Sequence, residues 1–193
     1  MINRQTFYAA VKLNLFKTIS EKQKQGMDAI LDYWEANGFH DGRHLAYIYA
    51  TVYHETARTM QPIEEYGKGK TRPYGQKQKH SGVKYTNPDK IYYGRGLVQL
   101  TWFENYELMT RLLRVDLLAN PDLACDMKIA IQIMFEGMMT GSSSFGDFTG
   151  KCLEMYFNDE VTDPIGARKI INGKDKAELI ASYYHIFLDA IIN

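Results

Sequence analysis

The sequence predicts a mainly α-helical, single globular domain that spans residues 1–193 and contains at most a small β-hairpin. Its 193 residues, 45% hydrophobic and 24% charged, match one soluble domain with a core of its own. Apolar side chains recur at spacings of three and four residues through most of the chain, as they do on amphipathic helices. One stretch, about residues 61–100, breaks this pattern, and an irregular segment of that length is usually functional or mobile.

Three helices are expected in the first part of the chain, over residues 4–19, 20–37 and 41–58. Ser20 and Gln23 form a capping box at the start of the second helix, and Gly38 suits the left-handed position after its end. Asp41 is the expected N-cap of the third helix. The inward-facing stripe of this third helix is expected to be Leu45, Ile48, Tyr49 and Val52.

The second half should also be helical, with expected helices over residues 101–115, 127–139, 151–158, 164–171 and from 175 onward. Their start signals are capping boxes or single caps, at Thr101 with Glu104, Asp126, Asp163 before Pro164, and Asp175 with Glu178. Residues 141–144 read as a loop. A short hairpin is weakly indicated within residues 61–90.

The formal net charge is zero, so overall charge gives no reason to expect nucleic acid or an anionic membrane as a partner. Locally the balance differs. Residues 67–90 contain one carboxylate, Asp89, and seven basic side chains, a net charge of +6 with His neutral: Lys68, Lys70, Arg72, Lys77, Lys79, Lys84 and Lys90. This basic segment suits an anionic polymer, or it is simply a solvated loop, and the sequence leaves both interpretations open.

Two cysteines, Cys125 and Cys152, are too few for a disulfide framework and are expected to be free thiols in a reducing compartment. No stretch approaches 18 apolar residues, so no transmembrane helix is expected. The first residues show neither an unbroken apolar run nor a small-residue cleavage site, which predicts synthesis in the cytoplasm without a signal peptide.

Glu55 is the strongest single candidate for a catalytic residue. On the expected helix its face also holds Thr51, Val52 and Ile48, so its carboxyl should be partly removed from water. Desolvation raises the pKa of a carboxyl group, which suits a general acid that works near neutrality. The alternative is an ordinary surface glutamate, although the helix macrodipole disfavours a negative charge near a helix C-terminus.

Residues 92–102 combine aromatic rings, two glycines and amide groups, and these are the groups with which a loop can bind a sugar. Gly94 and Gly96 permit tight turns, and Arg95 between them suits a buried ion pair that fixes the loop. Gln99 and Asn105 offer paired donors and acceptors for hydroxyl or acetamido groups. Thr101 is most simply an N-cap, a role compatible with a contact to substrate or water.

A second carboxylate is available at Glu64 or Glu65, and either one suits a general base, although a solvated pair beside basic residues is the simpler interpretation. Other chemistries are not supported. A zinc motif beginning at His54 would need histidine at position 58, where Arg58 stands, and a phosphate-binding loop would need glycine at position 64. No metal site and no cofactor is therefore expected.

Several segments together resemble glycoside hydrolase family 19, the chitinase-like, lysozyme-like fold that bacteriophage endolysins also use. The resemblance rests on residues 50–56, 92–102, 105–106, 115–122 and 170–173. Residues 59–63 and 171–180 are similar to compact single-domain phage lysins in particular. The resemblance covers about residue 28 to the C-terminus, and residues 92–102 carry its most specific part.

The resemblance implies an inverting glycosidase in which Glu55 is the general acid and Glu65 the general base, with Glu64 as the fallback. It implies that the Thr101 hydroxyl helps to hold the attacking water. The remaining implied roles are binding of N-acetylated sugars and the lining and bracing of the cleft, by Gln99, Asn105, Asn172, Tyr93 and Arg95.

These roles point to an endolysin that cleaves the β-1,4 bonds of peptidoglycan. Its expected location is the host cytoplasm, from which a holin-type pore would release it, as a monomer, to the cell wall or periplasm. A chitinase and a noncatalytic glycan-binding module are the alternatives. A lytic transglycosylase would differ by leaving anhydro-sugar ends.

Overall fold

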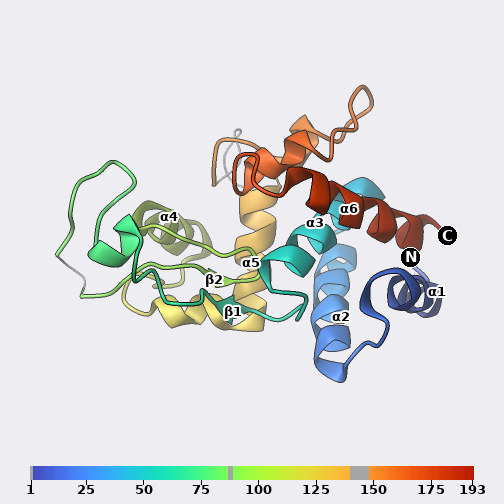
Figure 1. Ribbon diagram of the computed structural model, residues 1–193, viewed down its shortest axis with the longest axis horizontal. Coiled ribbons are helices and arrows are strands. Elements are labelled where there is room, and N and C mark those ends of the chain that lie inside the picture. The colour runs from blue at the N-terminus through green and yellow to red at the C-terminus, as the bar shows by residue number, and fades with distance from the viewer. Residues whose placement is uncertain (1, 87–88, 140–147) are drawn as a thin grey trace.

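The computed structural model describes residues 2–86, 89–139 and 148–193, and in these ranges the protein is mostly helical with one small sheet. The predicted fold class is confirmed. Figure 1 shows a group of helices around both termini on one side and a looser part on the other, with α5 (Met127–Met138) between them. The first group consists of α1 (Arg4–Val11), α2 (Glu21–Ala36), α3 (Gly42–Glu55) and α6 (Ala177–Ile192). We call it the helical lobe.

The helical lobe is built around α3. Its expected stripe is buried, but so are residues on its other faces, because α6 packs along it and α1 in turn packs on α6. Tyr49 stacks on Phe187 of α6, with ring centroids 5.3 Å apart, and donates its hydroxyl hydrogen to the carbonyl of Met27 in α2. The core therefore fixes the direction of α3 and with it the position of its last residue, Glu55.

The opposite side, which we call the loop lobe, holds α4 (Phe103–Leu113), β1 (Ile63–Glu64) and β2 (Arg95–Gly96). The two strands pair antiparallel, Ile63 with Gly96 and Glu64 with Arg95, so they join the two ends of the long irregular segment. Within residues 61–90, the hairpin that the sequence weakly indicated is reduced, among the described residues, to one bridge between Gln78 and Lys84. Helix α5 connects the lobes because it packs on both α2 and α4.

Several predicted helix starts are confirmed. Ser20 and Gln23 form the capping box of α2, and Gly38 follows that helix with a φ of +69°. Asp41 accepts a hydrogen bond from the backbone NH of Arg43. Asp126 likewise caps α5.

The predicted third helix was too long. Helix α3 ends at Glu55, three residues before Arg58, because the hydroxyl of Thr56 bonds back to the carbonyl of Val52 and accepts from the NH of Met60. Ala57 and Arg58 then adopt positive φ angles of 50° and 70°. This sharp exit places Glu55 at the end of a buried helix.

The capping prediction for α4 was wrong. The residue before the helix is Trp102, with a φ of 76°, and no side chain caps the helix. Thr101 instead donates its hydroxyl to the carbonyl of Gln99. Glu104, the expected partner in the capping box, accepts from the backbone NH of Ser81.

The last expected elements are also shorter than predicted. Residues 151–158 and 164–171 contain only single 3₁₀ turns, Leu153–Met155 and Gly166–Ile170. Asp175 does not cap α6: the left-handed Lys176 occupies the N-cap position, and no described side chain caps the helix. The loop expected at residues 141–144 lies outside the described residues.

Two further expectations concern composition. Cys125 and Cys152 are both free thiols, as predicted. Within the ranges that the structure describes, no helix combines the length and apolar character needed to cross a bilayer.

Candidate active site

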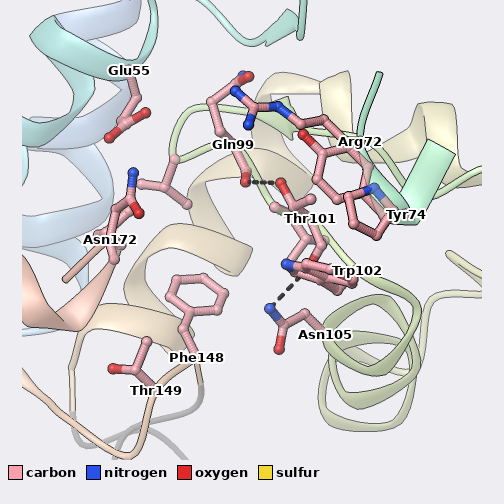
Figure 2. A pocket seen from close by; sticks show the side chains of 14 residues that line it. Glu55, Arg72, Tyr74, Gln99, Thr101, Trp102, Asn105, Phe148, Thr149 and Asn172 are labelled. Atoms are coloured by element: carbon pink, nitrogen blue, oxygen red, sulfur yellow. Dashed lines mark hydrogen bonds between the residues drawn. The ribbon is translucent and has the colours of Figure 1, made fainter. Parts of the chain in front are cut away.

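A pocket of about 400 Å³ lies between the two lobes and brings together most of the polar residues that the sequence singled out. The helical lobe contributes Glu55, and the loop lobe contributes Gln99, Thr101 and Asn105. Figure 2 shows Glu55 and Asn172 on one side of the pocket, with Thr101 and Trp102 on the other. The remaining lining residues are Arg72, Pro73, Tyr74, Val98, Leu100, Phe148, Thr149 and Ile171.

Glu55 is held at the pocket wall by an ion pair. Its side chain is 14% exposed, and its Oε1 lies 2.6 Å from Nη1 of Arg168, a side chain only 1% exposed. Arg168 is itself fixed, because its Nε donates to the backbone carbonyl of Asp175. Burial lowers the pKa of the neighbouring His54, so this histidine stays neutral near pH 7 and adds no second positive charge beside Glu55.

Sequence reasoning did not find Arg168. The pair spans 113 residues, and no local spacing connects the two side chains. One signal was available, because Arg168 lies close before Asn172 in the stretch 164–171 that the sequence predicts to be helical. A buried guanidinium requires a partner, so this position could have been matched to a carboxylate elsewhere in the chain.

The wall opposite Glu55 is formed by a strained turn. Gln99 and Trp102 have positive φ angles of 55° and 76°, a conformation that non-glycine residues adopt at a cost. The Thr101 hydroxyl donates to the Gln99 carbonyl at 2.8 Å, and the Asn105 amide donates to the Thr101 carbonyl at 3.0 Å (Figure 2). These bonds fix the direction of the polar groups, while the lone pairs of Thr101 Oγ1 remain as acceptors.

Tyr93 and Arg95 lie behind the pocket and do not line it. The guanidinium carbon of Arg95 is 3.6 Å from the centroid of the Tyr93 ring, and its Nε lies 3.0 Å from a carboxylate oxygen of Asp122. The Arg95 side chain is 4% exposed and also donates to the Tyr106 hydroxyl. The expected ion pair of Arg95 is therefore present, and these residues brace the turn.

Glu64 and Glu65 have different surroundings because adjacent residues in an extended chain point to opposite sides. Glu64 accepts from the Tyr93 hydroxyl and pairs with Lys68 at 2.9 Å. The Tyr93 hydrogen bond, and then the Lys68 hydrogen bond, lower the pKa of Glu64. This glutamate belongs to the brace behind the pocket.

Glu65 faces the pocket wall instead. Its Oε1 accepts from the hydroxyl of Tyr74 at 2.8 Å, and its Oε2 accepts from the backbone NH of Gly94 at 3.1 Å. Tyr74 lines the pocket, so Glu65 stands one hydrogen bond away from that wall. Burial and this hydrogen bond raise the pKa of Tyr74 to about 12, which keeps its phenol protonated as a donor to Glu65 near neutral pH.

The chain is similar to known chitinases in sequence. The model of the glycoside hydrolase 19 family, described as chitinase class I, matches residues 39–147, more than half of the chain. Endochitinase 1 of Theobroma cacao is 49% identical over 57 residues, which cover 29% of this chain and 18% of that protein. An endochitinase of Carica papaya is 50% identical over 42 residues, covering 22% and 17%. The matched segment thus spans less than a fifth of either relative.

Solved structures resemble the chain over its whole length. A bacterial family 19 chitinase aligns with a TM-score of 0.65 and 21% identity, covering 98% of this chain and 94% of that one. Chitinase C of Streptomyces griseus HUT6037 aligns with a TM-score of 0.61 and 20% identity, covering 100% and 77%. At these identities the likeness shows a shared fold.

Proposed function

Because the chain belongs to glycoside hydrolase family 19, we propose that it hydrolyses the β-1,4 bonds between the N-acetylated sugars of bacterial peptidoglycan, as a bacteriophage endolysin. The observation that carries the proposal is the pocket between the lobes, which is lined by Glu55 together with the amides of Gln99, Asn105 and Asn172. An acid beside several amides suits a glycan whose hydroxyl and acetamido groups must be held while one bond is protonated.

In the proposed mechanism Glu55 donates a proton to the glycosidic oxygen, and water attacks the anomeric carbon from the opposite face. Glu65 accepts a proton from that water, and Thr101 Oγ1 accepts a second hydrogen bond from it. Tyr74 stands between Glu65 and the pocket, so either it shifts on substrate binding or its hydroxyl relays the proton. An inverting enzyme of this kind needs about 6.5–9.5 Å between its carboxyl groups.

The decisive experiment digests purified peptidoglycan and identifies the fragments by mass spectrometry. Hydrolysis leaves reducing ends that carry the added water, and proton NMR of the first product should show the α-anomer. The Glu55→Gln protein should be at least about 100-fold slower, since a general acid contributes at least that factor. A folded Glu55→Gln protein that lyses outer-membrane-permeabilised cells at the wild-type rate would exclude Glu55 as the acid.

Chitin is the second candidate substrate, and it is favoured by the names of the relatives, which are endochitinases. Digestion of both polymers distinguishes the two functions, because chitin and peptidoglycan share the β-1,4 bond and differ in the groups on alternate sugars. Faster release from chitin oligomers than from peptidoglycan strands would favour the chitinase. Binding without new ends would indicate a noncatalytic module, and anhydro-sugar ends would indicate a transglycosylase.

The endolysin proposal includes a route to the substrate: the protein waits in the host cytoplasm until a holin-type pore opens, and then acts on the wall as a monomer. The two free thiols support the cytoplasmic step, since a reducing compartment keeps cysteines in this form. Fractionation of infected cells before and after lysis, with size-exclusion chromatography of the purified protein, tests this route.

A further inference from the structure

Arg72 places a positive charge in the wall of the candidate active site, and this charge has no ionic partner among the described residues. Among the residues known to line the pocket, two carry a formal charge, Glu55 and Arg72. The charge of Glu55 is matched by Arg168, whereas Arg72 forms no ion pair with any residue that the structure describes. A guanidinium without an ionic partner in the pocket wall suits a ligand that carries a negative charge.

Other basic residues of the same segment are already engaged. Lys68 pairs with Glu64, Lys77 pairs with Asp89, and the Lys79 ammonium lies 4.2 Å from the centroid of the Phe103 ring. None of these lysines lines the pocket. Arg72 therefore differs from these three lysines in both position and availability.

The backbone of Arg72 is fixed even though its side chain is exposed. It precedes the 3₁₀ turn Pro73–Gln76, donates its NH to the Gly69 carbonyl at 2.8 Å and accepts from the NH of Gly75 at 3.0 Å. A Cβ at Gly75 would lie 1.8 Å from the Gly69 carbonyl oxygen, so the turn needs glycine there. In Figure 2 the Arg72 side chain extends from the Tyr74 side of the pocket toward Gln99.

We propose that Arg72 is a specificity residue that binds a carboxylate of the glycan substrate and thereby favours peptidoglycan over uncharged chitin. The inference rests on the proposed function and adds a selecting residue to it. Chitin carries no carboxylate, whereas every second sugar of peptidoglycan bears a lactyl group whose carboxylate is free or extended by a peptide with carboxylates of its own. The planar guanidinium suits either source, because it donates two parallel hydrogen bonds to a carboxylate.

Two rival roles for Arg72 make different predictions. If it only donates hydrogen bonds to sugar hydroxyls, its loss slows cleavage of charged and neutral glycans equally. If Arg72 only offsets the negative charge of Glu65, which acts on the same Tyr74 phenol, its loss again changes the cleavage rates of both substrates alike. Selectivity between the two substrates is therefore the informative quantity.

The test compares wild type with Arg72→Gln, Arg72→Lys and the control Lys84→Gln, which removes one exposed charge from the same segment outside the pocket. The substrates are matched oligomers: uncharged chito-oligosaccharides, peptide-free glycan strands with free lactyl carboxylates, and strands with intact peptides. We expect Arg72→Gln to lower the ratio of kcat/KM for charged over neutral oligomers by about tenfold, the effect of one charge-assisted bond. Arg72→Lys should retain part of the ratio, and Lys84→Gln should leave it within twofold.

The two charged substrates identify the source of the carboxylate. If Arg72→Gln lowers kcat/KM only for peptide-free strands, Arg72 binds the carboxylate of the lactyl group. If it lowers kcat/KM only for intact strands, Arg72 binds a carboxylate of the peptide. Equal losses on charged and neutral oligomers, or an equal effect of Lys84→Gln, would overturn the proposal.

Failure of this inference can be separated from failure of the proposed function. A wild type that cleaves both classes, with no change of ratio in Arg72→Gln, refutes the role of Arg72 and leaves the hydrolase standing. Binding of peptide-free strands and of intact strands to Glu55→Gln, measured by calorimetry with and without Arg72→Gln, tests the contact without any turnover. If binding of neither strand weakens about tenfold, Arg72 does not bind the carboxylate.

Discussion

Glu55 and Arg168 illustrate, at the scale of single residues, how a carboxyl group is kept in a half-buried wall. A carboxylate removed from water needs a partner, and Arg168 supplies one at 2.6 Å from inside the core. In the proposed reaction Glu55 gives up a proton and ends as a carboxylate, which is the form that this guanidinium stabilises. Arg168 is in this sense a positioning residue, because it acts on the substrate only through Glu55.

Glu64 provides a prediction about pH. Because the Tyr93 and Lys68 hydrogen bonds lower the folded-state pKa of Glu64, its contribution to stability is complete above the unfolded pKa of about 4.3 and is lost as the pH falls through the folded value. The difference in melting temperature between wild type and Glu64→Gln should therefore be largest near pH 7 and shrink toward pH 3.

Thermal unfolding followed by circular dichroism across this pH range measures that difference. Glu65→Gln is the matched control, since it lies next in the chain and belongs to the proposed catalytic machinery. A gap between wild type and Glu64→Gln that stays constant down to pH 3 would contradict the assignment of Glu64 to the structural brace.

At the scale of elements, Gly96 in the turn formed by residues 92–102 and Gly67 earlier in the irregular segment have different steric surroundings. Gly96 has a φ of 89°, and a Cβ there would lie 2.7 Å from the carbonyl oxygen of Ala124. Gly67 has a similar φ of 84°, but a Cβ there would meet nothing within 4 Å. Alanine substitutions at Gly67 and Gly96 therefore separate the cost of backbone strain from the cost of a steric clash with a neighbouring residue.

We expect Gly67→Ala to cost about 1 kcal/mol of unfolding free energy, the ordinary penalty of a left-handed residue. Gly96→Ala should cost clearly more, about 2–4 kcal/mol, because the Ala124 carbonyl must move as well. Urea unfolding monitored by Trp fluorescence measures both values. Equal costs would show that the contact at Ala124 relaxes freely.

Several helix starts could be predicted from sequence, because a helix cap depends on neighbours within four residues. Ser20, Asp41 and Asp126 bond to amides two or three positions away, which a pattern can detect. The Thr101 cap failed because a different local arrangement replaces it: Trp102 adopts a positive φ, and the Thr101 hydroxyl donates to the Gln99 carbonyl.

Pairings across the fold escaped the same reasoning. Arg168 reaches Glu55 over 113 residues, and the position of Arg72 in the pocket depends on how the 3₁₀ turn packs beside Trp102. The sequence favours Glu65 over Glu64 as the general base only through the family resemblance. Its hydrogen bond to Tyr74 now supports that preference with geometry, while its catalytic role stays a prediction.

At the scale of the whole molecule, the pocket is shared between two lobes, so a bound glycan should stabilise both. With the Glu55→Gln protein to prevent cleavage, an N-acetylglucosamine oligomer at 100 times its Kd should add about 2.7 kcal/mol of stability. For a chain of this size that corresponds to a rise in melting temperature of about 5–10 °C.

Differential scanning calorimetry measures this rise, with a β-1,4-linked glucose oligomer of equal length as the control. The glucose oligomer lacks acetamido groups and should shift the transition less, since Gln99, Asn105 and Asn172 are expected to bind those groups. An equal shift with both oligomers, or a transition that splits so that one lobe melts unchanged, would count against the shared pocket as the binding site.

The ion pair between residues 55 and 168 also sets an order of events during folding. Both sides of the pair depend on long-range contacts: α3 packs on α6 at the far end of the chain, and Arg168 meets Glu55 only after the chain has closed a loop of 113 residues. Such long closures are slow, and their entropic cost must be met before the contact forms. Assembly of the candidate site should therefore be among the last steps of folding, so that an unfinished chain carries the glutamate without the arginine that holds it.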